Sequence, residues 1–497
     1  MGFVPEPRSP EFEHSLPLNS PVARIPATTV GRLRNEHNVV DPWVPAAERV
    51  PTICDAVWMT RTSTRLSWFT DRVRRPWNAP EKERPRLSSD FWKYWTGQTI
   101  SNLGTSFTTF ALPLLVYKLT GSALNLAFST AAAYLPYLLF GLLIGAWVDR
   151  VNRKRLMIAT NVASALIVSS IPLLALMGRL AVEWIYAVAF SSTSVGIAFT
   201  TAEFAAIPSL VPGQSLVTAN GRIQASFSAA TVIGPLLAGA LLAFVSVQNL
   251  FLVDAFSFLV SAAILAWIRQ SFNAPPGAER RVQHIGRDIV EGLRYVLAHP
   301  VLRAISAMMA LVNFVGTTRY TQVVLFAKEQ LSASDREIAL LFSAGSAGVV
   351  VLSLAAGRLR KRWSFAQVAL GALMLNGIIF LGFAFNRWYW VGVLLWAVGS
   401  GLGTLFNINT LSLRQAIAPN ELLGRVISIA QVLAWSAIPL GAVIGGVAID
   451  RSHNVVLVFA VIGLLVFLIP LGFSFTALGH SERYMPARQA SQTSSAG

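Results

Sequence analysis

Four ionisable side chains lie inside long apolar stretches of this 497-residue chain: Glu203, Arg222, Asp254 and Arg319. A charge inside an apolar stretch of bilayer-spanning length is costly, so such residues mark candidate functional sites. A carboxyl group in that setting can take up and release a proton, and a guanidinium group can bind an anion. These residues are the candidates for ion coupling and ligand binding.

The first two residues are predicted to pair. Glu203 and Arg222 lie at equal distances from the turn signal Pro212-Gly213, which indicates similar depth on neighbouring antiparallel helices. We predict a buried ion pair, which adds little net stability but is costly to break. Protonation of Glu203 would free Arg222 and act as a switch, and a static clamp between two helices explains the residues equally well.

Asp254 is the second candidate for proton coupling. Ser257 and Ser261 fall on the same helical face as this carboxyl group. A structural hydrogen-bonding role is the favoured interpretation, and proton transfer is the alternative.

Five polar residues of the later apolar stretches are predicted to line a substrate cavity: Asn313, Arg319, Gln322, Asn407 and Asn409. An arginine in a cavity favours an anionic or hydrogen-bond-accepting substrate. The alternative for Arg319 is a side chain that extends to the outer membrane interface.

Several catalytic signatures are absent from the sequence. It has no G-x-x-x-x-G-K-[ST] phosphate loop, no H-E-x-x-H motif and no Cys/His cluster, and its single cysteine cannot form an intrachain disulfide. We therefore expect no enzyme activity, no metal site and no cofactor.

The elements that hold these residues are apolar helices. The chain is 54% hydrophobic and 13% charged, whereas soluble proteins average nearly a quarter charged residues. Twelve apolar stretches of about 20 residues follow Asp90, which is the length that crosses a bilayer. The sequence predicts an all-α membrane protein with twelve transmembrane helices in two pseudo-symmetric six-helix bundles.

Composition divides the chain into five segments. They are a disordered cytoplasmic N-terminal extension (1–89), a first six-helix bundle (90–268), a cytoplasmic linker (269–300), a second bundle (301–480) and a disordered cytoplasmic tail (481–497). Met59 offers an alternative start, so residues 1–58 carry no part of the functional argument.

The linker contains an amphipathic stretch. Its apolar residues share one helical face: Ile285, Ile289, Leu293, Val296 and Leu297. We predict a helix on the inner membrane surface that tethers two moving halves.

The net charge of +16 is explained by topology. With the N-terminus inside, the inner loops and the tail hold 18 Lys and Arg residues and the outer loops hold 6. This bias predicts that both termini are cytoplasmic. Nucleic-acid binding loses its basis, and the lipid bilayer is the expected surrounding.

The two halves share landmarks at a nearly constant offset. The triplet Arg153-Lys154-Arg155 recurs 207 residues later as Arg360-Lys361-Arg362, and Pro235 recurs 204 residues later as Pro439. These matches suggest a duplicated six-helix unit, and such repeats build transporters with a substrate site between the halves.

The stretch GAWVDRVNRKR at residues 145–155 resembles the signature of the major facilitator superfamily, G-x-x-x-D-R-x-x-R-K/R. Asn152 stands where the superfamily usually has glycine. Further stretches, such as Ala206–Pro212 and Asp254–Phe258, are similar to the drug:proton antiporter branch that includes macrolide efflux proteins and enterobactin exporters. The resemblance covers roughly residues 90–480 and implies the major facilitator fold.

The resemblance also implies roles for two motifs. One is a cytoplasmic gate in which Asp149 meets the start of helix 11 near 421–424, and its residues are Gly145, Asp149, Arg150, Arg153, Lys154 and Arg155. An interfacial Asp that offsets its Arg neighbours is the alternative. The other is the helix-5 motif of antiporters, which Gly234, Pro235 and Gly239 resemble, although an ordinary kink explains these residues equally well.

The expected function is secondary active transport, with proton-coupled efflux of an amphipathic small molecule such as a drug or macrolide by alternating access. A siderophore or another endogenous metabolite is the alternative cargo. A non-transporting membrane receptor or scaffold is the alternative of another class. The expected partners are a small molecule, protons and the cell membrane, and we expect a monomer.

Overall fold

The computed structural model describes residues 87–148, 151–212, 215–273, 285–360, 362–419 and 422–484, all within one compact unit, Pro80–Gly497. Most of the predicted terminal segments 1–89 and 481–497 lie outside the described residues. Asp149 and Arg150 of the predicted gate also lie outside them.

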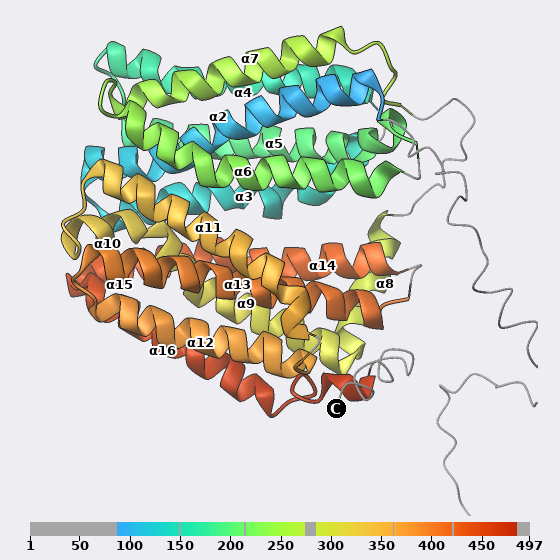
Figure 1. Cartoon of the computed structure of the whole chain (residues 1–497), viewed down its shortest axis with the longest axis vertical. Coiled ribbons are helices and arrows are strands. Elements are labelled where there is room, and N and C mark those ends of the chain that lie inside the picture. Colours follow the sequence, from blue (N-terminus) through green and yellow to red (C-terminus); the bar gives the residue numbers. More distant parts are fainter. Residues whose placement is uncertain are drawn as a thin grey trace, which may run out of the picture. The chain divides into compact units, whose positions relative to one another are not determined.

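The first half of the described chain forms six long helices (Figure 1). They are α2 (Ser89–Thr120), α3 (Ala123–Val148), α4 (Arg153–Leu176), α5 (Val182–Leu210), α6 (Leu216–Leu241) and α7 (Leu250–Trp267), with a short 3₁₀ helix η2 (Val247–Asn249) before α7.

The second half repeats this plan with two interrupted helices. Its elements are α9 (Pro300–Thr321), α10 (Val323–Glu329), α11 (Asp335–Arg360), α12 (Phe365–Phe385), α13 (Tyr389–Ile417), α14 (Leu423–Trp435), α15 (Ala437–Ser452), α16 (Val455–Ser474) and the 3₁₀ helix η3 (Ser481–Tyr484). The breaks fall at Gln322 and Ser436. Pro439 follows the second break, where its missing N–H cannot continue the helical hydrogen bonds.

Eleven stretches of the described residues are long and apolar enough to cross a membrane. The helix α2 is not among them, because its first half carries polar residues such as Lys93, Gln98 and Asn102. It is nevertheless 32 residues long, and it packs against α6 and α7 as part of the first bundle. The twelfth membrane span therefore stays a prediction.

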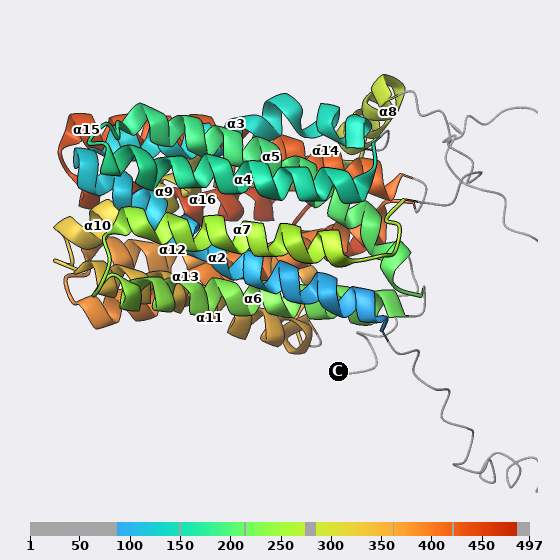
Figure 2. The ribbon, with the colours of Figure 1, turned by 90° about the horizontal axis from the view of Figure 1, so that it is seen from above.

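The helices gather into two bundles, α2–α7 and α9–α16, which appear as the upper and lower groups in Figure 1. The bundles meet along two helix pairs, α6 with α11 and α3 with α15, and Figure 2 shows α6 and α11 side by side. Glycines permit these close crossings: Gly239 faces Ala339, and Gly446 faces Ala127. Any side chain at either glycine would collide with the other bundle.

We name the two ends of the bundles by the chain segments found there. The linker end holds the start of α2 and the segment between α7 and α9, and the opposite end holds the turn between α2 and α3. At the opposite end, Lys118 of α2 forms an ion pair with Asp335 of α11. Gln322 donates a hydrogen bond of 2.7 Å to the Ala123 carbonyl. Both contacts join the two bundles.

The linker helix α8 (Ile285–Ala298) packs on the second bundle. Val296 is buried with Val426 and Ile429 of α14, and Glu291 pairs with Arg425 at 2.7 Å. Part of the predicted apolar face is thus covered by protein, although Leu297 stays exposed. The location of this helix on the membrane surface stays a prediction.

Candidate functional site

Glu203 lies near the linker end of α5 and contacts α2. Its carboxylate accepts a hydrogen bond from the hydroxyl of Tyr94, a residue that is only 2% exposed. Glu203 itself is partly buried. The phenol supplies the polar partner that a carboxyl group needs among apolar helices.

Arg222 does not pair with Glu203 in the part of the chain that the structure describes. Its guanidinium lies over the Trp92 ring, 4.6 Å from the ring centroid, and the side chain is exposed. The indole nitrogen of Trp95 donates to the Arg222 carbonyl at 3.2 Å. The predicted buried ion pair is therefore wrong in this structure.

The reason for this difference is helix packing. The prediction took α5 and α6, which are consecutive in the chain, as spatial neighbours. In the structure α2 packs against both α5 and α6. Its Tyr94 reaches Glu203 and its Trp92 reaches Arg222. Glu203 and Arg222 therefore contact different side chains of α2 and do not contact each other in the described structure.

Asp254 of α7 is deeply buried, with 1% of its surface exposed. Its carboxylate accepts hydrogen bonds from the hydroxyls of Thr108 at 2.5 Å and Thr105 at 3.3 Å, both on α2. Ser257 adds a longer contact of 3.4 Å from the same helix. This network joins α2 to α7, as a structural hydrogen-bonding role requires.

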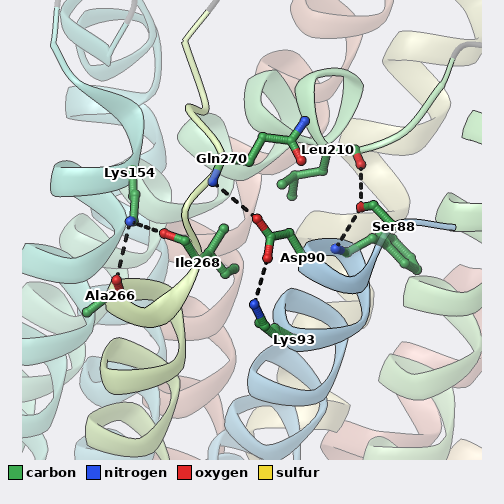
Figure 3. Close-up of polar contacts among 9 residues, drawn as sticks. Ser88, Asp90, Lys93, Lys154, Leu210, Ala266, Ile268 and Gln270 are labelled. Carbon is green, nitrogen blue, oxygen red and sulfur yellow. Dashed lines mark hydrogen bonds and ion pairs between the residues drawn. The ribbon is translucent and has the colours of Figure 1, made fainter.

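Two basic residues of the predicted gate, Lys154 and Arg153, bind backbone carbonyls near the linker ends of neighbouring helices, and Figure 3 shows the contacts of Lys154. Lys154 donates to the carbonyls of Ile268 and Ala266 at the end of α7. Arg153 donates to the Ala205 carbonyl of α5 at 3.0 Å. Cations are favourable at these helix C-termini, where free carbonyls gather. Arg155 is exposed.

Asn152 is the N-cap of α4. Its side chain accepts a hydrogen bond of 3.0 Å from the backbone N–H of Arg155. Asparagine is among the best N-cap residues, better than the glycine that the superfamily usually has at this position. The departure from the motif thus stabilises the start of the helix that carries Arg153 and Lys154.

The start of α2 belongs to the same cluster. Asp90 accepts a hydrogen bond of 3.1 Å from the Gln270 backbone and forms an ion pair of 2.8 Å with Lys93, and Ser88 donates to the Leu210 carbonyl at 3.0 Å (Figure 3). The linker end of the first bundle is therefore held together by polar contacts among α2, α4, α5 and α7.

The remaining described residue of the predicted gate, Gly145, lies within α3.

The helix-5 motif lies in α6, which continues through Pro235 as a helix. Gly234 faces Ser106 of α2, and Gly239 faces Ala339 of α11. The glycines thus allow close packing on both neighbours.

A cavity of about 330 Å³ lies in the second bundle. Three of the five predicted cavity residues line it, namely Asn313, Arg319 and Asn407. The other lining residues are mostly aromatic, small or hydroxylic: Val312, Tyr320, Val323, Phe342, Gly345, Ser346, Val349, Leu373, Trp396, Ser400, Gly403, Thr404 and Phe406. All of them come from α9–α13, so this cavity is built by one bundle.

Arg319 is buried beside this cavity, with 4% of its surface exposed. Its Nη1 donates to Asn376 Oδ1 at 2.7 Å, and its guanidinium lies 4.0 Å from the Phe380 ring centroid. The alternative of a side chain reaching the outer interface is therefore wrong.

Gln322 and Asn409 do not line this cavity, contrary to the prediction. Gln322 is fully buried at the break between α9 and α10 and bonds to α3. Asn409 donates to the Leu405 carbonyl of its own helix at 2.7 Å. Both amides satisfy backbone carbonyls. Asn313 does so as well, because it donates to the Ala434 carbonyl near the second break at 2.9 Å.

Several residues of these sites were not predicted from the sequence, above all Tyr94, Thr108 and Trp396. Aromatic residues near helix ends are common at membrane interfaces, so Tyr94 carried no distinctive signal. Threonine is likewise ordinary in transmembrane helices.

Two bundles of apolar helices, one of which encloses a polar and aromatic cavity, are the architecture of a multi-pass membrane transporter. The family described as Transmembrane secretion effector matches residues 85–490. The chain belongs to this family of the major facilitator superfamily, whose members are transporters of small molecules and not enzymes.

Curated relatives include proteins named as efflux pumps. The multidrug efflux pump Tap of Mycolicibacterium fortuitum is 30% identical over 368 residues, which cover 70% of this chain and 86% of that protein. Macrolide efflux protein A of Streptococcus pyogenes is 24% identical over 370 residues, which cover 73% and 89%. These relatives and the apolar helices identify a multi-pass protein of the cell membrane.

Solved structures share the fold. A bacterial homologue of the human lysosomal transporter Spinster, in an inward-facing and unoccupied conformation, aligns with a TM-score of 0.62 and 14% identity over 80% of this chain and 97% of that chain. The nucleoside transporter NupG aligns with a TM-score of 0.65 and 11% identity over 77% and 98%. At this identity the likeness concerns the fold alone.

Proposed function

We propose that this protein is a proton-coupled exporter that moves an amphipathic small molecule out of the cell by alternating access. The observation that carries the proposal is the cavity in the second bundle, because its aromatic and polar lining suits a molecule with both characters. The curated relatives named as multidrug and macrolide efflux pumps support the direction and the cargo class. A drug or macrolide-like cargo is the first candidate.

The proposed orientation follows from the distribution of basic residues, with both termini and the linker end in the cytoplasm. The contacts of Lys118 with Asp335 and of Gln322 with Ala123 would then close the outer end. Substrate would enter from the cytoplasm, and separation of these contacts would release it outside. A monomer contains all of these parts.

The proposed proton sites are Glu203 and, second, Asp254. Both carboxylates accept hydrogen bonds from α2, and the far end of α2 carries Lys118, which bonds to the other bundle. A change of protonation would alter how α5 and α7 hold α2. That change would be passed to the contacts between the bundles.

A second cargo class is a siderophore or another anionic metabolite. The observation in its favour is the buried guanidinium of Arg319 beside the cavity. A cation there favours substrates with acidic or hydrogen-bond-accepting groups.

Reconstituted proteoliposomes test the proposal. A panel of radiolabelled amphipathic compounds, namely one acid, one neutral amide and one amine of matched ring system, is offered with and without an imposed pH gradient. We expect accumulation of at least one compound that requires the gradient and stops when a protonophore is added. Binding without flux would favour a receptor, and flux that ignores the gradient would contradict proton coupling.

A further inference from the structure

The cavity of the second bundle holds a cation without a counter-ion. Arg319 is the only charged residue among the described residues that line it. The Nε atom of Arg319 is buried and has no hydrogen-bond partner. We infer that this cavity binds the carboxylate of an amphipathic, ring-containing anion. The inference rests on the proposed export function and names its substrate class.

The guanidinium is held in place by neighbouring helices. Asn376 donates its Nδ2 to the Gly399 carbonyl, so its Oδ1 is turned toward Arg319 and accepts from Nη1. The ring of Phe380 supports the guanidinium face at 4.0 Å. The guanidinium lies back against Gly316 of its own helix. The cation is therefore positioned before any ligand arrives, which reduces the cost of binding.

A neutral amide cannot offset this charge. Asn376 satisfies one N–H of the guanidinium, and the Tyr320 hydroxyl makes only a long contact of 3.5 Å with Nη2. A planar guanidinium has five N–H donors and binds a carboxylate through two parallel hydrogen bonds. Burial of an unpaired charge is costly, and a bound carboxylate would relieve that cost.

The rest of the cavity fits the body of such a ligand. The rings of Tyr320 and Trp396 meet edge to face at 5.4 Å, and Phe342 and Phe406 add further aromatic surface. The hydroxyls of the lining can bind polar substituents. A basic drug would meet a like charge in this cavity, so acids are favoured over amines.

Arg414 provides an internal comparison. It is also buried with an unpaired Nε, but its Nη2 contacts the sulfur of Met309 at 3.1 Å and it does not line the cavity. Substitution of Arg414 therefore tests whether loss of any buried arginine has the same effect as loss of Arg319.

Isothermal titration of the purified full-length chain with three naphthalene probes tests the inference. The probes are 2-naphthoate, 2-naphthamide and 2-naphthylmethylammonium, which share the ring system and carry an anionic, a neutral and a cationic substituent. We expect naphthoate to bind at least about 10-fold more tightly than the amide and the ammonium probe to bind most weakly. Arg319→Gln should abolish this order, and Arg414→Gln should keep it.

Two further variants keep the test informative if Arg319→Gln folds poorly. Arg319→Lys should keep the preference for naphthoate but weaken it, because an ammonium group lacks the planar fork. Asn376→Asp should place a carboxylate against Arg319 and lower naphthoate affinity as strongly as Arg319→Gln does.

Equal binding of the three probes to the natural chain would overturn the inference, and so would an unchanged preference in Arg319→Gln. Gradient-driven transport of the ammonium probe in preference to naphthoate would also overturn it while leaving the export function intact. Tight naphthoate binding without any flux would leave the anion site intact and contradict the export function.

Discussion

At the residue scale, the guanidinium of Arg222 contacts the Trp92 ring instead of Glu203. An exposed cation–π contact contributes about 0.5–1 kcal/mol. Arg222→Gln should therefore keep gradient-driven transport within about two-fold of the natural protein, with a small loss of thermal stability. Flux in proteoliposomes measures the first effect. Complete loss of coupling in a folded variant would restore the ion-pair hypothesis.

The predictable part of the cavity is its polar residues. Polar side chains inside apolar helices are conspicuous in a sequence, and Asn313, Arg319 and Asn407 do line the cavity. Gln322 is just as conspicuous, yet a break in the helix turns it toward α3. Tyr94 was not predicted, because its hydroxyl reaches Glu203 only when α2 packs against α5.

At the element scale, α4 begins at an N-cap that the family signature lacks. Asn152→Ala should lower the free energy of unfolding by about 1 kcal/mol, because the Arg155 N–H loses its acceptor. Asn152→Ser is the matched control, because its hydroxyl can accept from the same N–H, and it should cost only a few tenths of a kcal/mol. Thermal or denaturant unfolding in detergent measures both. Equal effects of the two substitutions would show that the cap contributes nothing.

The ion pair at the opposite end joins α2 to α11. Asp335 also bonds to Lys328 of its own bundle at 2.6 Å. Lys118→Ala removes the contact between bundles, whereas the control Lys328→Ala removes only the contact within one bundle. Because the pair is partly exposed, we expect the ratio of conformations open at this end to closed conformations to rise by up to about five-fold in Lys118→Ala. The same ratio should stay unchanged in Lys328→Ala.

Spin labels at exposed positions 179 and 387, one on each bundle, report this opening by pulsed electron resonance in a Cys54→Ser background. Longer distances in Lys118→Ala than in Lys328→Ala are the expected result. Identical distance distributions in the two variants would contradict a latch between the bundles.

At the scale of the whole molecule, the internal repeat predicted two related bundles, and the structure has them. The lengths of the hydrophobic stretches and the landmarks that recur at a constant offset were sufficient for that prediction. The contacts between helices were not predictable in the same way, because α6 meets α11 and α3 meets α15 across large separations in sequence. Glycines such as Gly239 and Gly446 permit these close crossings, but glycine is common in transmembrane helices and does not indicate the partner helix.

Gradient-driven transport in Glu203→Gln tests the central claim most directly. The probe is the panel compound that the natural protein accumulates, and Asp254→Asn is measured in parallel. We predict that Glu203→Gln loses accumulation driven by the pH gradient but still exchanges substrate across the membrane without one, because the cavity lies in the other bundle. Full gradient-driven accumulation in Glu203→Gln would contradict this account of proton coupling.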